Sequence, residues 1–236
     1  MKSIAIDIYS DGAEIEKMKD SYKSGKVSGF TTNPSLMKKA GITSYTEFAQ
    51  EVVAEFPSVP ISFEVFSDDF EIMKKEALKI AEYGDNVFVK IPITNTKGES
   101  SIPLIHELSK EGLSLNVTAI LTIDQVEETV DAFVEGTTNI VSVFAGRIAD
   151  TGVDPLPIMK QSVEICQHKA GTKLLWASSR EVLNILQADE IGADIITCTP
   201  DLIAKLKNIG KDLKELSLDT VKMFNTDIKS LGYSIL

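Results

Sequence analysis

The chain has 236 residues, of which 43% are hydrophobic and 25% charged, and its formal net charge is −11. This composition is that of an ordinary globular protein, and the acidic balance argues against nucleic acid as a partner, because nucleic-acid binding draws on basic surface. No apolar run is long enough to span a bilayer, and the short apolar N-terminal stretch is interrupted by Asp7, so we expect a cytoplasmic protein without a signal peptide.

Short β-branched runs alternate with longer amphipathic segments along the chain. The expected strands are Ser3–Ile8, Val27–Thr31, Ile61–Phe66, Asn86–Ile91, Ser114–Ile120, Ile140–Val143, Lys173–Ala177 and Asp194–Thr197. The clearest helical patterns between them are Phe70–Tyr83, Ser101–Glu111, Ile123–Glu135, Pro155–His168 and Arg180–Ala188. A further helix is expected at about Ser217–Ser230. Glycines that we expect to end helices in a left-handed conformation are Gly84, Gly112, Gly136, Gly171 and Gly192.

Eight parallel strands joined by helices can close into a barrel or form an open, doubly wound sheet. The count of eight favours the barrel. An open sheet usually has a glycine-rich turn after its first strand, and the segment Tyr9-Ser10-Asp11-Gly12 lacks the G-x-G-x-x-G pattern. Since no linker divides the chain, we expect one α/β domain over residues 1–236, a (β/α)8 TIM barrel with an additional C-terminal helix.

Polar residues interrupt strands that should be apolar on both faces. Because side chains alternate along a strand, the aliphatic residues share one face and the polar ones the other. The polar face carries Asp7, Glu64, Lys90, Asn116, Thr118 and Ser142. We expect these side chains to point into the barrel near the C-terminal strand ends, where active sites of this fold lie. Plainer roles stay open for single members: a loop cap for Asp7, an ion pair between Glu64 and Lys90, or simple interior hydrogen bonds.

Lys90 is the member that is hardest to explain as a surface residue, because it stands between Val89 and Ile91 and precedes Pro92. An amine held in a barrel can attack a ketone and form an iminium ion, which accepts the electrons of a breaking C–C bond. This chemistry needs no metal and no organic cofactor. The attacking amine must be uncharged, a state that burial favours, and nearby carboxylates would serve as acid–base groups.

Two segments after the sixth and seventh expected strands suit a phosphate group. The first contains Arg147, and the second reads Ala177-Ser178-Ser179-Arg180 where a helix is expected to begin. Hydroxyls, guanidinium groups and a helix N-terminus all bind phosphate. The alternative is that Ser178 or Ser179 caps the helix and that the arginines are solvated.

The two cysteines, Cys166 and Cys198, are far apart and lack a metal-ligand pattern, and the chain has only two histidines. We therefore expect no metal site and interpret both cysteines as buried apolar residues.

Several segments together resemble the transaldolase family over essentially the whole chain. They are Gly29–Leu36, Val87–Thr94, Leu115–Thr118, Val141–Ile148 and Ala177–Arg180. The length resembles the short subfamily, which includes fructose-6-phosphate aldolase.

The resemblance implies a Schiff-base mechanism without a cofactor. Lys90 would be the nucleophile, Asp7 would handle the substrate hydroxyl proton during C–C cleavage, and Glu64 and Thr118 would hold a catalytic water. The substrate would be bound by Asn33, Asn116, Ser142 and Phe144, and its phosphate by Arg147, Ser178 and Arg180.

The implied reaction transfers a dihydroxyacetone unit from sedoheptulose 7-phosphate or fructose 6-phosphate to an aldose phosphate, in the non-oxidative pentose phosphate pathway. The partners would be sugar phosphates and further copies of the chain, because the short subfamily tends to form pentamers and decamers with the last helix reaching onto a neighbour.

Two positions favour transfer over simple aldol cleavage. Fructose-6-phosphate aldolases carry glutamine where this chain has Glu64 and tyrosine where it has Phe144. Aldolase activity stays the alternative, and a non-catalytic phosphosugar-binding barrel is a minor one. The chain departs from the family pattern at Ile8, Tyr9, Glu99, Val143 and Trp176. The Trp176 ring would either narrow the phosphate pocket or pack between a strand and a helix.

Overall fold

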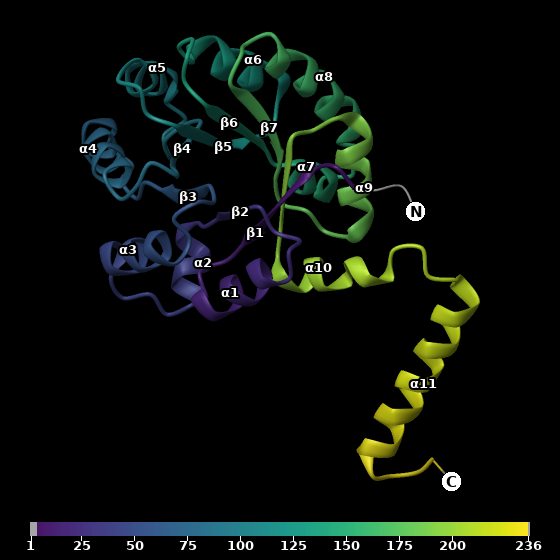
Figure 1. Cartoon of the computed structure of the whole chain (residues 1–236). Helices are drawn as coiled ribbons and strands as arrows, with labels where there is room; N and C mark the ends of the chain where they lie inside the picture. Colours follow the sequence, from purple (N-terminus) through teal and green to yellow (C-terminus); the bar gives the residue numbers. More distant parts are fainter. Residues whose placement is uncertain (1–3, 236) are drawn as a thin grey trace.

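The computed structural model describes residues 4–235, and its centre is a closed barrel of eight parallel strands in sequence order. The strands are β1 (Asp7–Asp11), β2 (Gly29–Thr31), β3 (Ile61–Glu64), β4 (Val87–Pro92), β5 (Leu115–Ile120), β6 (Asn139–Val143), β7 (Thr172–Trp176) and β8 (Ile195–Cys198). Helices surround this barrel (Figure 1). The expected (β/α)8 TIM barrel is confirmed.

Helices connect the strands, and further helices follow the last strand, β8. The helices are α1 (Ile15–Lys23), α2 (Pro34–Lys39), α3 (Tyr45–Glu55), α4 (Phe70–Ala81), α5 (Ile102–Lys110), α6 (Ile123–Ala132), α7 (Ala145–Asp150), α8 (Leu156–Gln167), α9 (Val182–Ile191), α10 (Pro200–Ala204) and α11 (Leu213–Leu231), with the 3-10 helix η1 (Lys205–Asn208). The sequence patterns missed α1, α2, α3, α7 and α10. No helix in the described range is long and apolar enough to cross a membrane.

The first strand lies later in the chain than its apolar pattern predicted. The expected strand was Ser3–Ile8, of which Ser3 falls outside the described residues, whereas β1 begins at Asp7 and ends at Asp11. The reason is the hydrogen-bonded register: Asp7 lies opposite Ile195 of β8, and Asp11 lies opposite Thr31 of β2. Neighbouring strands therefore decide which extended residues belong to the barrel.

The barrel interior contains an apolar layer below the C-terminal strand ends. It consists of the buried residues Tyr9, Ile140, Leu175, Ala177 and Ile195, with Phe88 and Phe144 packed against it. The Tyr9 ring occupies the space over Gly29, where an added Cβ would lie 2.6 Å from ring atoms. The larger apolar cluster, which includes Ile8, Val143 and Trp176, contains the residues of the opposite strand face.

Expected glycine caps are correct for Gly112 and Gly192, which follow α5 and α9 with positive φ. The expectation is wrong for Gly84, whose φ is not positive. An added Cβ at Gly84 would lie 2.8 Å from Val53 Cγ1, so close packing is the constraint at this position.

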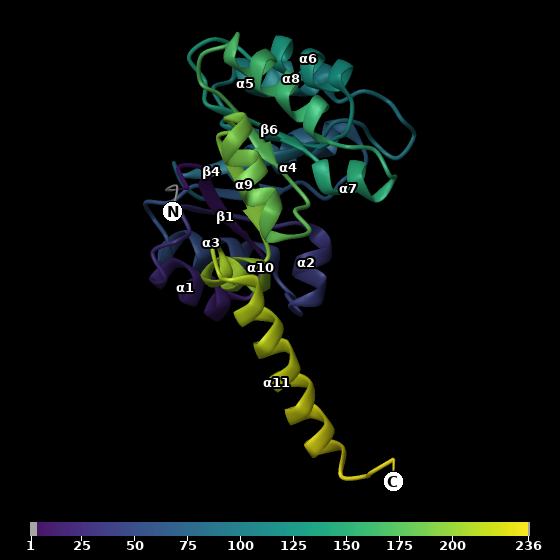
Figure 2. The same ribbon diagram turned by 90° about the vertical axis from the view of Figure 1, so that its right-hand side faces the viewer.

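The last helix, α11, extends away from the barrel in both views (Figures 1 and 2). It begins after Asp212, whose carboxylate accepts the backbone N–H groups of Lys214 and Glu215. This confirms the expected C-terminal helix and lengthens it at its N-terminal end. None of its residues, all of which the structure describes, is buried.

Candidate active site

The C-terminal ends of the strands surround a cavity of about 200 Å³ at the mouth of the barrel. Its lining consists of Asp11, Thr31, Asn33, Lys90, Asn116, Thr118, Ser142, Phe144, Arg147, Leu175, Ala177, Ser178 and Thr197. A more open hollow of about 590 Å³ adjoins it and shares Lys90, Thr118 and Phe144 while adding Glu64. The structure thus brings together most of the residues that the sequence predicted, with Asp7 and Arg180 as the exceptions.

Lys90 lies on β4 with its side chain inside the barrel and only 6% of the residue exposed. Its Nζ donates to the Thr32 carbonyl at 2.8 Å and lies 3.0 Å from Glu64 Oε2. Parallel register places Lys90 opposite Glu64 of β3 and Asn116 of β5. The amine is therefore held between a carboxylate and a carbonyl, and it faces the cavity.

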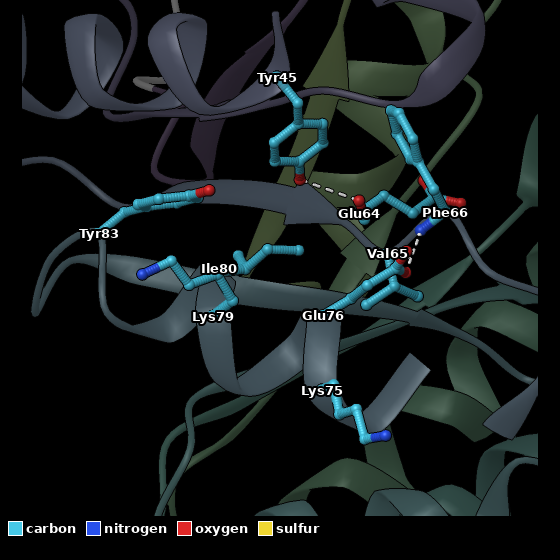
Figure 3. A pocket seen from close by; sticks show the side chains of 9 residues that line it. All are labelled: Tyr45, Glu64, Val65, Phe66, Lys75, Glu76, Lys79, Ile80 and Tyr83. Atoms are coloured by element: carbon cyan, nitrogen blue, oxygen red, sulfur yellow. Dashed lines mark hydrogen bonds between the residues drawn. The ribbon is translucent and has the colours of Figure 1, made fainter. Parts of the chain in front are cut away.

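The end of β3, which carries Glu64, is fixed from outside the barrel. The Tyr45 hydroxyl on α3 donates to the Glu64 carbonyl at 2.9 Å, and Glu76 on α4 accepts the backbone N–H of Phe66 at 2.8 Å (Figure 3). These residues line an apolar hollow of about 340 Å³. Two helices thus hold the strand end, while the Glu64 side chain reaches the amine on the inner side.

A chain of hydrogen bonds crosses the interior beside Lys90. Ser142 Oγ donates to Asn116 Oδ1 at 2.6 Å, and Asn116 Nδ2 donates to Ser62 Oγ at 3.0 Å. All three residues are buried. The Asn116 amide is therefore hydrogen-bonded on both sides, to a hydroxyl of β6 and to a hydroxyl of β3.

Asp7 does not lie at this site, and the expectation that it would is wrong. It is exposed at the start of β1, where it accepts a hydrogen bond from Ser28 Oγ at 3.1 Å. Its inward direction follows the alternation as predicted, but the mouth of the barrel is four residues further along the strand, about 13 Å at 3.3 Å per residue. Asp11 has the same parity and lies at the mouth.

Asp11 is the acidic residue that the sequence patterns missed. It lines the cavity, and its Oδ1 accepts a hydrogen bond from Thr31 Oγ1 at 2.8 Å. Burial raises the pKa of the Asp11 carboxyl, while the positive charge of Lys90 and the Thr31 hydrogen bond oppose that rise. The sequence signal that could have found Asp11 is its position four residues after Asp7, which puts both side chains on the same strand face. The pair Asp11-Gly12 instead resembled a turn after the strand.

Thr31 and Thr197 are two further residues of the mouth that the sequence did not single out. Thr31 ends β2 and Thr197 lies on β8, and both are buried. Their Oγ1 atoms are 2.5 Å apart. Single threonines in strands carry no distinctive sequence signal, because threonine is common in strands for its β-branched shape.

Arg147 and Ser178 both line the cavity. The Arg147 guanidinium lies 5.6 Å from the centre of the Phe144 ring. Ser178 has a φ of 63°, a left-handed conformation that non-glycine residues rarely adopt. Gly146 permits this approach, because a Cβ there would lie 1.6 Å from the Ser178 carbonyl oxygen. A cation and a hydroxyl thus face the cavity together and suit an anion.

Arg180 does not line the cavity. Its guanidinium pairs with Asp150 at the end of α7, and both side chains are about half exposed. Neither Ser178 nor Ser179 caps the following helix, because α9 begins after Glu181. Ser179 Oγ instead donates to the Thr197 carbonyl at 2.8 Å. The proposed capping role is therefore wrong for both serines.

Trp176 does not narrow the cavity. It is 1% exposed and belongs to the larger apolar cluster, so the packing interpretation is correct.

Cys166 and Cys198 are buried and free, as expected. Burial raises the pKa of Cys166 to about 12 and that of Cys198 to about 11. Within residues 4–235, no group of three or more His, Cys, Asp or Glu side chains is arranged to hold a metal ion.

Comparison with known proteins gives one family over nearly the whole chain. Residues 8–235 match the model of the family described as transaldolase/fructose-6-phosphate aldolase. A probable transaldolase of Methanococcus maripaludis is 35% identical over 204 residues, covering 85% of this chain and 89% of the relative. A probable transaldolase of Nitrosopumilus maritimus is 32% identical over 229 residues, covering 94% and 99%.

Similar solved structures share the fold at low sequence identity. One is KGPDC from Streptococcus mutans, with a TM-score of 0.57 and 12% identity, covering 84% of this chain and 90% of that chain. Another is dihydrodipicolinate synthase from Rhodopseudomonas palustris, with a TM-score of 0.58 and 14% identity, covering 92% and 79%.

Proposed function

Because the chain belongs to the transaldolase/fructose-6-phosphate aldolase family, we propose that it is a transaldolase working through a Schiff base on Lys90. It transfers a dihydroxyacetone unit from a ketose phosphate to an aldose phosphate in the non-oxidative pentose phosphate pathway. The observation that carries this proposal is a buried Lys90 amine 3.0 Å from Glu64, facing a cavity that also contains Asp11 and Asn116.

The first half of the proposed reaction forms the imine. The Lys90 ammonium gives a proton to Glu64, and the neutral amine attacks the ketone carbon of the donor. The resulting carbinolamine loses its hydroxyl as water, with a proton delivered by Glu64, and leaves an iminium ion. Thr118, which lines both the cavity and the adjoining hollow, lies where it can hold that water.

The second half breaks and remakes the C–C bond. Asp11 accepts the proton of the substrate hydroxyl next to the scissile bond, the bond breaks, and the iminium accepts the electron pair as an enamine. The aldose phosphate product leaves. The enamine then attacks the aldehyde of the acceptor, Asp11 returns its proton to the new alkoxide, and water releases the new ketose from Lys90.

Substrate orientation is assigned to the polar groups around the amine. Asn33 Oδ1 accepts the N–H of Leu36 at the start of α2, which leaves its amide N–H groups for a substrate hydroxyl. Asn116 and Ser142 lie on the opposite side and bind donor hydroxyls. Arg147 and Ser178 bind the phosphate. Arg180 joins them only by leaving Asp150, so its phosphate role stays a prediction.

The alternative is an aldolase that cleaves or forms the same bond without transfer, and the family description covers both activities. The acidic Glu64 beside Lys90 and the Phe144 ring at the cavity support transfer.

Trapping and transfer assays test the proposal. Borohydride with fructose 6-phosphate should leave a covalent adduct on Lys90, and fructose 6-phosphate with erythrose 4-phosphate should give a seven-carbon ketose phosphate. Absence of the adduct together with normal turnover in Lys90→Ala would refute the mechanism. Efficient joining of dihydroxyacetone to glyceraldehyde 3-phosphate without transfer would favour the aldolase.

A homo-oligomer is the second part of the proposal, and α11 supports it. Its large apolar residues include Leu213, Val221, Phe224 and Ile228, each more than half exposed. Such a face is costly to leave in water, and a neighbouring copy of the chain would cover it. Analytical ultracentrifugation tests this: the full chain should form a closed oligomer, and Val221→Asp/Phe224→Asp should dissociate it.

A further inference from the structure

A row of two hydroxyls leads from β8 to the carboxylate of Asp11. Thr31 Oγ1 donates to Asp11 Oδ1 at 2.8 Å, and Thr197 Oγ1 lies 2.5 Å from Thr31 Oγ1. Thr31 and Thr197 are 3% and 7% exposed, and both line the cavity. Bulk water therefore competes little for these hydrogen bonds.

The proton order in this row is fixed while Asp11 is ionised. A threonine hydroxyl has a single proton, and that of Thr31 is used toward Asp11. Thr197 Oγ1 must therefore donate the short hydrogen bond to Thr31 Oγ1. If Asp11 takes up a proton, it can donate to Thr31, and the order can reverse. The row can thus stabilise either charge state, and it favours the ionised one because a carboxylate accepts the stronger hydrogen bond.

We propose that Thr197 is a positioning residue, whose hydroxyl acts through Thr31 to hold the Asp11 carboxylate ionised and directed into the cavity. This inference rests on the proposed function, in which Asp11 accepts the substrate hydroxyl proton. Thr197 does not need to touch the reacting atoms. Its effect passes through a single hydroxyl, that of Thr31.

Other charged groups also act on Asp11, and they stay in place when Thr197 is changed. Lys90 favours the ionised form and Glu64 opposes it. Arg147 lines the same cavity, and the Cys198 thiol interacts with Asp11 from β8. A neighbouring hollow that also contains Asp11 is lined by the charged residues Glu14, Lys17, Lys39 and Asp201. Removing the Thr197 hydroxyl therefore isolates the contribution of the hydroxyl row.

The test compares Thr197→Val with Thr197→Ser in the fructose 6-phosphate to erythrose 4-phosphate transfer assay across pH. In Thr197→Val, kcat should fall about tenfold with KM nearly unchanged, and the acidic limb of the kcat profile should move to higher pH by about one unit. Thr197→Ser, which keeps the hydroxyl, should restore both values. If Thr197→Val does not fold, Thr197→Ala takes its place.

A matched control is Thr172→Val, because Thr172 Oγ1 is buried without a hydrogen-bond partner among the described residues and lies at the other end of the barrel. This variant should leave the pH profile unchanged.

The inference is overturned if Thr197→Val keeps the wild-type pH profile. It is also overturned if Thr197→Val lowers kcat as much in an Asp11→Asn background as it does in the wild type. Borohydride trapping separates the two proposals: a wild-type protein without a Lys90 adduct or turnover refutes the transaldolase mechanism itself.

Discussion

The two ends of strand β1 carry the same kind of side chain on the same face, yet their surroundings differ completely. Asp7 at the base is exposed and accepts a hydrogen bond from Ser28 Oγ. Asp11 at the mouth is surrounded by Lys90, Glu64 and Thr31. Between them lies an apolar layer that includes Tyr9. Alternation along a strand therefore fixes the direction of a side chain, whereas the depth of the residue in the barrel decides which groups surround it.

The largest difference between mouth and base should appear with the two inward lysines. Lys90 lies at the mouth, and Lys173 near the base shares the face of Leu175 on β7. Lys90→Met should lower kcat by roughly 10⁴-fold or more, because among the described residues that line the cavity and its adjoining hollow Lys90 is the one lysine that can form the imine. Lys173→Met, the matched control, should keep transfer activity within about twofold. Comparable losses of kcat in the two variants would contradict the assignment of catalysis to the mouth of the barrel.

The two carboxylates give the next largest contrast. Asp11→Asn should lower kcat by about 10²- to 10⁴-fold, the usual range for a lost acid–base group, while Lys90 still forms the borohydride adduct. Asp7→Asn should be within about twofold of wild type. Steady-state transfer kinetics decide the matter, and a severe loss in Asp7→Asn with a mild one in Asp11→Asn would reverse our assignment.

Arg147 and Arg180 allow two cations near the mouth of the barrel to be compared for phosphate binding. Arg147→Ala should raise the KM for fructose 6-phosphate by about 10- to 100-fold, since a charge-assisted hydrogen bond to phosphate is lost. Arg180→Ala should raise it less, because this side chain is already paired with Asp150. Borohydride trapping of the Lys90 adduct with unphosphorylated fructose, which needs no acceptor, is the control, with little effect expected from either change. Equal KM increases would place both arginines on the phosphate.

The apolar layer between the two ends can be tested through Gly29. An added Cβ would lie 2.6 Å from the Tyr9 ring, so Gly29→Ala should lower the free energy of unfolding by about 1–3 kcal/mol through overpacking. Adding Tyr9→Leu should recover most of that loss. Urea denaturation measures both variants. If Gly29→Ala is as stable as wild type, the position of the Tyr9 ring does not require a glycine at residue 29.

The smallest expected effect is a pH dependence of stability. Because the pKa of Asp11 is raised in the folded protein, the group favours folding below its unfolded pKa of about 3.9, and this contribution is lost as pH rises through the folded pKa. Asp11→Asn should therefore gain stability relative to wild type at pH 7 but not at pH about 4.

Much of the fold was predictable because it depends on local spacing. Alternating aliphatic residues located eight strands, and parity correctly directed Glu64, Lys90, Asn116 and Ser142 into the barrel. The ion pair between Glu64 and Lys90, open as an alternative at the sequence level, is present. Short helices such as α7 and α10 were missed because five or six residues give too little periodicity.

The amino-acid sequence was enough to determine the strand count, the inward face of the first, third, fourth, fifth and sixth strands, and the inward position of Lys90. Only the tertiary structure decided that Asp11 and not Asp7 reaches the mouth, that Thr31 and Thr197 meet, and that Arg180 turns to Asp150. The physical reason is that the direction in which a side chain points depends on the alternation within its own strand. Depth and partnership depend on hydrogen-bonded register with strands that are distant in sequence.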